Sequence, residues 1–270
     1  MDAFSRFEHA GWAEAGRATG YDRLLARITA RVVDPLLDAA RVGDGSRVLD
    51  LACGPGQAAA RALDRGARPV GVDLSAAMIE LARARHPAIE FHQAAAESLP
   101  FPAASFDAVV ANFLLPHLAD PSVAAAEAAR VLASGGRLAL SVWDLPSRAR
   151  FVGILLDAIT EAGASPPADL PPGQPFFRYA EPDAIFDLFH SAGFTEVSLT
   201  TATFDQQLSS VDELWHGLLD GTVRTSALVM AQPAPVQAEI RAAFERLAAP
   251  YDLSVPVAAV IAAGELSSGR

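Results

Sequence analysis

Two aspartates and a pair of glycines have the spacing expected of a site for a charged, sugar-bearing ligand. Asp50 lies near the end of one apolar stretch and is followed by Gly54 and Gly56, and Asp73 ends the next apolar stretch. Glycines between a strand and a helix let the backbone approach a ligand closely, and the helix start offers free amide donors. An acid in the position of Asp73 can accept both hydroxyls of a ribose.

The same glycine segment also allows a dinucleotide-binding loop, in which a pyrophosphate sits at the helix N-terminus. Ala59 stands where that loop has its third glycine, a change that the pattern tolerates. Asp50, however, would repel a pyrophosphate and attract an ammonium or sulfonium group. The residues therefore favour a cationic nucleoside, and a nicotinamide oxidoreductase is the weaker alternative.

Candidate reactive groups follow two later apolar stretches. His117 is the candidate general base, because it follows a predicted strand, and the carboxyl ends of the strands face the ligand crevice in an open parallel α/β sheet. The alternative is that His117 shapes the loop before Asp120. Asn112 ends the same strand and either orders a ligand or is structural. Trp143 and Asp144 end the next strand at the same rim, and we expect Trp143 to be a wall of the pocket.

Strands and helices alternate in the part of the chain that carries these residues. Strands are predicted at 47–51, 69–72, 89–92, 106–113 and 137–142, and helices at 57–64, 75–85 and from 121 to the glycines at 135–136. This alternation is typical of right-handed βαβ units. It predicts an α/β, Rossmann-like doubly wound, mostly parallel sheet with helices on both faces.

We expect a single domain over 1–270, with an N-terminal helical cap (1–44), a cofactor-binding core (45–145), the rest of the sheet (146–208 and 251–270) and a helical insert (209–250). Ser210 and Glu213 make a capping box at the start of the insert. Its apolar residues predict a lid over the strand ends together with the N-terminal helix, with Tyr21 and Trp215 in the substrate pocket. The alternatives are a helical layer that completes the core, or a homodimer interface.

Composition excludes several classes of partner. The chain has 270 residues, with 32 acidic against 21 basic side chains and a net charge of −11, which argues against nucleic acid and anionic membrane as partners. The single cysteine, Cys53, rules out an internal disulfide and a four-cysteine metal site, and we predict no metal. The start lacks a signal-peptide pattern, and we find no stretch near the ~18 apolar residues of a membrane span, so a cytoplasmic protein is expected.

Over about residues 45–144 the sequence resembles the class I S-adenosylmethionine-dependent methyltransferases, in particular the small-molecule group with a type-11 core. The segments that carry the resemblance occur in the family's order: Val48–Gly56, Val70–Ser75 with Met78, Glu97–Phe101, Ser105–Val109, Phe113, His117-Leu118, Asp120-Pro121, Arg130–Leu132 and Gly135–Leu138. The resemblance implies S-adenosylmethionine as cofactor and methyl transfer to a small, fairly apolar acceptor at oxygen, nitrogen or carbon.

The resemblance also implies roles for individual residues. Asp50 and the backbone around Gly54 would hold the methionine end of the cofactor, and Asp73 the ribose. Leu74 and Met78 would flank the adenine. The remaining cofactor-binding candidates on this basis are Ala52, Gly56, Ala96, Glu97 and Asn112.

Two positions depart from the family pattern. Ala52 replaces the first glycine of the loop, and Ala95 replaces an aspartate that meets the adenine amino group. Stacking and backbone contacts must then hold the adenine, or the affinity is lower. Ala95 therefore favours the alternative of a non-methylating relative, such as a cyclase or a ligand-binding protein.

Overall fold

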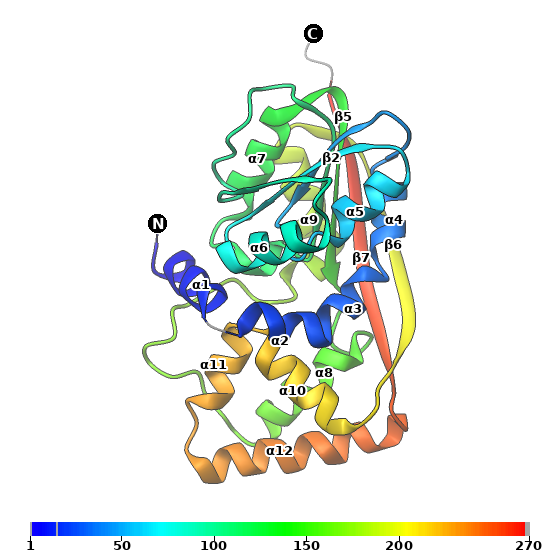
Figure 1. Ribbon diagram of the computed structural model, residues 1–270. Coiled ribbons are helices and arrows are strands. Elements are labelled where there is room, and N and C mark those ends of the chain that lie inside the picture. The colour runs from blue at the N-terminus through cyan, green and yellow to red at the C-terminus, as the bar shows by residue number, and fades with distance from the viewer. Residues whose placement is uncertain (1, 15, 268–270) are drawn as a thin grey trace. The chain divides into compact units, whose positions relative to one another are not determined.

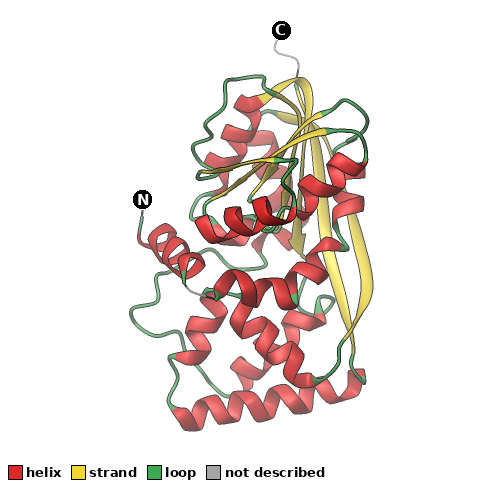
Figure 2. Cartoon of the chain, viewed as in Figure 1, coloured by secondary structure: helices red, strands yellow, loops and turns green. Residues whose placement is uncertain are grey.

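The computed structural model describes residues 2–14 and 16–267 and forms two compact units, each assembled from separate stretches of sequence. The helical unit contains the described residues up to Ile28, with Trp143–Gly173 and Thr203–Ala259. The sheet unit contains Thr29–Val142, Gln174–Ala202 and the described residues from Val260 onward. Figure 1 labels the helices and some of the strands of both units, and Figure 2 distinguishes helices, strands and loops.

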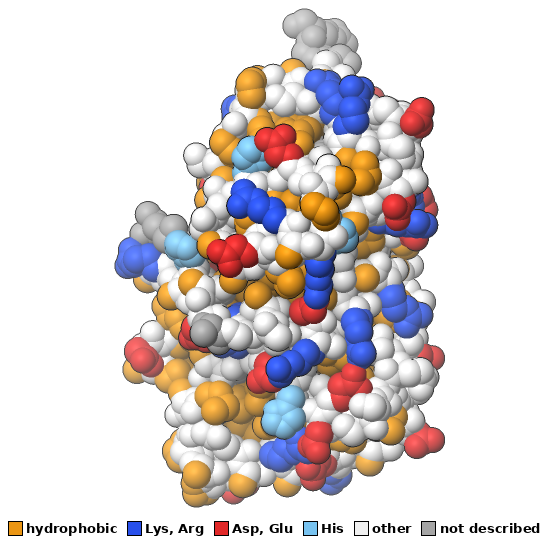
Figure 3. All heavy atoms as spheres, viewed as in Figure 1, with side chains coloured by type: hydrophobic (Ala, Val, Ile, Leu, Met, Phe, Trp, Pro, Cys, Tyr) orange, Lys and Arg blue, Asp and Glu red, His pale blue; other side chains and the backbone are white. Residues whose placement is uncertain are grey.

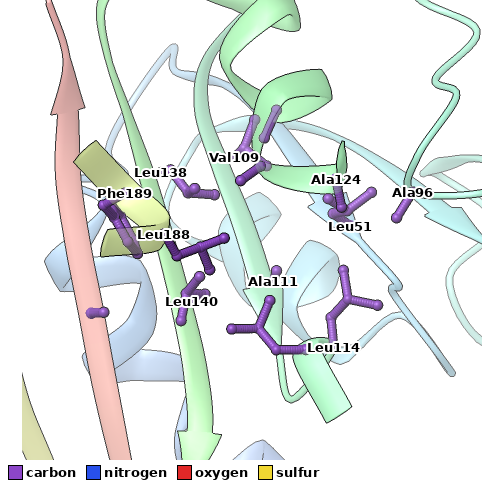
Figure 4. Close-up of a cluster of buried hydrophobic side chains, with 14 of the residues drawn as sticks. Leu51, Ala96, Val109, Ala111, Leu114, Ala124, Leu138, Leu140, Leu188 and Phe189 are labelled. Carbon is purple, nitrogen blue, oxygen red and sulfur yellow. The ribbon is translucent and has the colours of Figure 1, made fainter. Parts of the chain in front are cut away.

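Seven strands form one sheet in the order β3-β2-β1-β4-β5-β7-β6. Their bounds are β1 Arg47–Leu51, β2 Arg68–Asp73, β3 Glu90–Gln93, β4 Phe106–Asn112, β5 Leu132–Trp143, β6 Phe194–Gln207 and β7 Ser254–Leu266. The neighbouring pairs from β3 to β5 are parallel, and β7 runs opposite to β5 (Figure 4). The predicted doubly wound, mostly parallel sheet is confirmed. The strand order reverses between β1 and β4, and ligands bind at the carboxyl ends of strands at such a reversal.

Helices flank these strands at positions that local capping explains. In the sheet unit they are α4 Val33–Ala39, α5 Gln57–Asp64, α6 Ala76–Arg85, α7 Pro121–Val131 and α9 Pro182–Ser191, with single turns η1 Leu115–His117 and η2 Arg178–Ala180. The Ser75 hydroxyl accepts the Met78 amide at the start of α6, and the Asp120 carboxylate accepts the Ser122 amide at the start of α7. Both residues satisfy amides that a helix start leaves unpaired.

The main core of the sheet unit lies between β1, β4 and β5 and the helices α7 and α9. Figure 4 shows part of this cluster, with Val109 and Ala111 on β4, Leu138 and Leu140 on β5, and Leu188 with its neighbour on α9. Strand residues are buried in nearly unbroken runs, as expected of parallel strands covered on both faces. A smaller cluster contains Cys53, Ala59, Ile79, Ala82, Ile89 and Phe91.

The helical unit combines the N-terminal helices with late ones: α1 Ala3–Ala13, α2 Arg17–Arg23, α8 Arg150–Glu161, α10 Val211–Gly221, α11 Arg224–Met230, α12 Ala234–Ala248 and the turn η3 Ala249–Tyr251. The chain packs closely here, since a Cβ on Gly217 would lie 2.3 Å from Leu24 Cδ2. The Arg17 guanidinium donates to the carbonyls of Leu219 and Asp220 at the end of α10, at 3.0 and 3.2 Å. The lid over the strand ends stays a prediction.

The described residues of the stretch 1–44 form four helices, and the two units divide this stretch after Ile28, within α3 (Leu25–Ala30). Residues 146–173 and 203–208 were expected with the sheet region and belong to the helical unit. One predicted strand boundary was wrong. Strand β5 begins at Leu132 instead of 137, because Leu132 pairs with Phe106 ahead of a register shift. The glycines at 135–136 therefore lie within an irregular strand and do not end the helix.

Charged side chains of both signs are interspersed on the face shown in Figure 3. Among the helices of the described residues, none is long and apolar enough to cross a bilayer.

Candidate active site

The loop between β1 and α5 turns sharply and approaches its neighbours closely. Ala52, Gly54 and Gly56 all have positive φ, at 58, 51 and 86°. A Cβ on Gly56 would lie 2.9 Å from Phe91 Cζ and 3.0 Å from a His86 ring carbon, so only glycine fits there without movement. Ala52 adopts a conformation that glycine takes freely and that costs an L-residue about 1–2 kcal/mol. The loop therefore keeps its shape at some cost in strain.

Asp50 reaches this loop from β1. Its side chain is buried, and Oδ2 accepts the backbone N–H of Ala59 in the first turn of α5, at 2.8 Å. Burial raises the pKa of Asp50 to about 7; the Ala59 hydrogen bond opposes this change and the charge of Asp73 adds to it. The carboxyl is thus placed at a helix start, where the macrodipole favours negative charge.

Asp73 reaches the same loop from β2. Its Oδ2 accepts the Gly54 amide and its Oδ1 accepts the Ser75 amide, both at 2.8 Å. Burial raises the pKa of Asp73, while these two hydrogen bonds and the nearby His117 lower it. The charge of Asp73 contributes to the raised pKa of Asp50, so the two carboxyls interact. The predicted pair of acids on one glycine loop is therefore present in the fold.

Other residues predicted to contact the cofactor lie beside Asp73. Gln93 Nε2 donates to the Leu74 carbonyl at 3.0 Å, and Met78 is buried in the first turn of α6. The Ala94 amide donates to the Asp73 carbonyl at 3.1 Å, so the segment with Ala96 and Glu97 starts next to β2. Ala96 is buried in the main core cluster and Glu97 is partly exposed.

Asn112 has scaffold partners that the sequence did not suggest. Its Nδ2 donates to the Thr29 carbonyl at 3.2 Å, and its Oδ1 accepts the Ser141 hydroxyl at 2.6 Å. These bonds fasten the end of β4 to β5 and to α3. Asn112 thus has a structural role in the described chain, and its contact with a ligand stays a prediction.

His117 is the last residue of η1 and lies near Asp73, whose pKa its charge lowers. Sequence analysis missed the residue that holds its loop. Gln174 Nε2 donates to the carbonyls of Leu118 and Ala119, at 3.3 and 3.1 Å. Since Gln174 lies 55 positions after Ala119 in a proline-rich stretch, no local pattern could have identified it.

The three aromatic residues predicted for the substrate pocket all belong to the helical unit. Tyr21 meets Trp12 edge to face at 5.8 Å between ring centroids, and Trp143 meets Phe151 at 4.6 Å. Trp215 packs against Phe244 at 5.1 Å, with the Arg241 guanidinium 5.0 Å from its ring centroid. The predicted cofactor residues, in contrast, all lie in the sheet unit.

Cys53 is buried in the smaller core cluster, and burial with the two neighbouring aspartates raises the pKa of its thiol. A thiol with a raised pKa is a poor nucleophile. Within the described part of the chain, no group of three or more His, Cys, Asp or Glu side chains is arranged to hold a metal ion.

Comparison with known proteins gives the family. The model of the type-11 family, described as a methyltransferase domain, matches residues 49–140. A demethylmenaquinone methyltransferase of Paenarthrobacter aurescens is 30% identical over 171 residues, which cover 60% of this chain and 68% of that protein. The chain thus belongs to the class I S-adenosylmethionine-dependent methyltransferases of the type-11 group, whose cofactor is S-adenosylmethionine.

Solved structures have the same fold. The YcgJ protein of Bacillus subtilis matches with a TM-score of 0.56 and 19% identity, covering 88% of this chain and 98% of that one. A chain from the complex between the Haloferax volcanii Trm112 methyltransferase activator and a methyltransferase matches with a TM-score of 0.58 and 20% identity, covering 99% of both chains. Three further demethylmenaquinone methyltransferases match over only 51–54% of their length, so the chain spans about half of these curated relatives.

Proposed function

We propose that the chain binds S-adenosylmethionine at the β1–α5 loop and transfers its methyl group to a small, fairly apolar organic acceptor. The observation that carries the proposal is that Asp73 accepts the Gly54 amide in the loop and Asp50 accepts the Ala59 amide at the start of α5, so that two strands place carboxyls at the same strand–loop–helix turn. Carboxylates have about four lone-pair sites, so each retains acceptor capacity beyond these amides. This donor set fits a ligand with an ammonium group and a ribose diol.

In this proposal each residue has a defined task. The sulfonium of the bound cofactor supplies an already activated methyl group. Asp50 holds the cofactor's ammonium, and Asp73 holds the ribose hydroxyls. His117 takes a proton from the acceptor where the acceptor must lose one. Positioning of the acceptor and exclusion of water, which need no further reactive group, can supply several kcal/mol of the barrier reduction.

The acceptor is proposed more broadly than the relatives' names suggest. Relatives named demethylmenaquinone methyltransferase make demethylmenaquinone the first acceptor to try, together with phenols and amines. We further propose that Tyr21, Trp143 and Trp215 contact the acceptor, and that the protein acts without nucleic acid or membrane. We also propose that the chain forms a homodimer. A measurement of its molecular mass in solution tests this.

Calorimetry with S-adenosylhomocysteine, followed by transfer of a labelled methyl group, tests the function. Binding by the wild-type chain and label in any acceptor support it, and absence of binding would remove it. His117→Asn is expected to lower transfer much more than it weakens the binding of S-adenosylhomocysteine, because its charge also acts on Asp73.

The residue at position 95 favours a second candidate function, in which the chain binds the cofactor or another ligand without transferring a methyl group. Its methyl side chain offers the adenine no hydrogen bond, and its carbonyl already accepts the Ser98 amide at 3.1 Å. Binding of S-adenosylhomocysteine without label transfer to any acceptor of the panel would favour this candidate over the first.

A further inference from the structure

One carboxylate in the helical unit has an unusual environment. Asp144, directly after β5, is fully buried. Its amide donates to the Ala258 carbonyl at 3.0 Å, which continues the pairing of β5 with β7 and fixes the backbone. Its Oδ1 accepts the Leu145 amide at 2.7 Å and the Arg148 guanidinium at 2.6 Å. Its Oδ2 is also buried, and among the described residues no donor reaches it.

An oxygen in this state is costly. A buried acceptor without a partner loses its water and gains nothing, a penalty of about 1–3 kcal/mol that is larger for charged groups. Such groups are rare in native proteins and each calls for an explanation, such as a role in binding. Arg148 is the only side chain described as bound to Asp144, and it binds Oδ1. Asp144 Oδ2 is therefore an acceptor that no described donor occupies.

The location of Asp144 indicates what donates to it. Asp144 directly follows Trp143, the last residue of β5, and Trp143 is proposed to contact the methyl acceptor. A group of the acceptor that lies against Trp143 is therefore the donor that we consider for Oδ2. The bound Arg148 largely compensates the charge of the carboxylate. The remaining oxygen is suited to a neutral donor rather than to an ammonium group.

We infer that Asp144 is a specificity-determining residue whose Oδ2 accepts a hydrogen bond from a neutral O–H or N–H group of the methyl acceptor. This inference rests on the proposed function. It narrows the acceptor to apolar molecules that carry a hydroxyl or an N–H, and disfavours those that offer only acceptor oxygens.

Two probes with the same ring system test the inference: 2-naphthol, which can donate, and its methyl ether 2-methoxynaphthalene, which cannot. Their dissociation constants are measured by NMR titration of the full chain with saturating S-adenosylhomocysteine. We expect the wild type to bind 2-naphthol about tenfold more tightly, the value of one hydrogen bond. In Asp144→Asn an amide N–H replaces the acceptor, and the preference should disappear. Asp157→Asn, a change on the same unit at a half-exposed carboxylate paired with Arg150, should keep it.

A second measurement does not depend on any variant. The Leu145 amide donates to the same carboxylate, so its resonance should shift with 2-naphthol and not with 2-methoxynaphthalene. Equal binding of both probes, binding of neither, or an unchanged preference in a folded Asp144→Asn would overturn the inference. Binding of S-adenosylhomocysteine in the same samples separates this failure from failure of the proposed function.

Discussion

The carboxylate of Asp73 accepts the backbone N–H of Gly54 across 19 positions of sequence, at 2.8 Å. The side chain that is proposed to hold the ribose thus also fixes the glycine loop. We expect Asp73→Ala to weaken S-adenosylhomocysteine binding about 10- to 100-fold, because charge-assisted hydrogen bonds contribute about 1.5–3 kcal/mol each. Calorimetry measures the change. Asp64→Ala, at an exposed carboxylate that ends α5, is the control and should bind like the wild type.

Asp50 should make the ligand-free chain less stable as the pH rises. Its pKa is about 7 in the folded chain against 3.8 for an unperturbed aspartate. The folded chain therefore holds the carboxyl proton of Asp50 up to a higher pH than the unfolded chain does. The stabilisation that this proton gives is complete below about pH 4 and is lost as the pH rises through 7. At about 1.4 kcal/mol per pKa unit, the loss is at most about 4 kcal/mol.

Asp50→Asn removes this loss. In thermal unfolding without ligand, the variant should gain stability over the wild type increasingly between pH 4 and 8. A difference between the two that does not change with pH would contradict the buried, protonated carboxyl.

Ligand binding should have the opposite pH dependence at Asp50. The ammonium group of S-adenosylhomocysteine is attracted by the ionised carboxylate, which is only partly present at pH 7 in the free chain. The affinity of the wild type is therefore expected to rise through pH 7 and then level off. Asp50→Asn should bind more weakly at pH 8 and show a flatter profile. Calorimetry at several pH values, in buffers of different ionisation enthalpy, also detects the released proton.

Local patterns predicted the part of the fold that positions the acids. Strand β1 and helix α5 have the predicted bounds, because the apolar run ends at a loop of small residues and the helix starts after Gly56. Ser75 and Asp120 were recognisable as helix caps for the same reason, since a cap depends on residues two or three positions away.

Contacts between distant segments could not be predicted in this way. Asn112 was a ligand candidate by its place after a strand, but its partner Thr29 lies 83 positions earlier and only the fold brings them together. The start of β5 was misplaced for a similar reason, because pairing with Phe106 extends a strand through glycines that locally favour a turn. The two units interleave along the chain, and no change of composition marks their boundaries.

Ala52 gives a prediction of unusual sign. Its φ of 58° suits glycine, so Ala52→Gly should stabilise the chain by about 1 kcal/mol, after the extra flexibility of glycine in the unfolded state is subtracted. Chemical denaturation measures this gain. The same substitution at Ala60, inside α5, should cost about 1 kcal/mol, as glycine does in helices. Destabilisation by both substitutions would mean that the loop is not strained at Ala52.

Gln174 should control the mobility of the His117 loop rather than the stability of the whole chain. Gln174→Met keeps the length of the side chain and removes both hydrogen bonds to the Leu118 and Ala119 carbonyls. With about 1 kcal/mol for each bond, local opening of η1 should increase about tenfold or more. Hydrogen exchange of the His117 and Leu118 amides, which donate to the carbonyls of Leu114 and Leu115, reports this opening.

Two further variants separate positioning by Gln174 from a general effect of losing an amide side chain. Gln174→Lys restores a donor and should slow the exchange again, whereas Gln93→Met, which removes the bond to the Leu74 carbonyl, should leave η1 unchanged. Wild-type exchange at His117 in Gln174→Met would refute the role of Gln174. If the loop does open, methyl transfer should fall in Gln174→Met while S-adenosylhomocysteine binding stays within about twofold, because Asp50 and Asp73 keep their own amide partners.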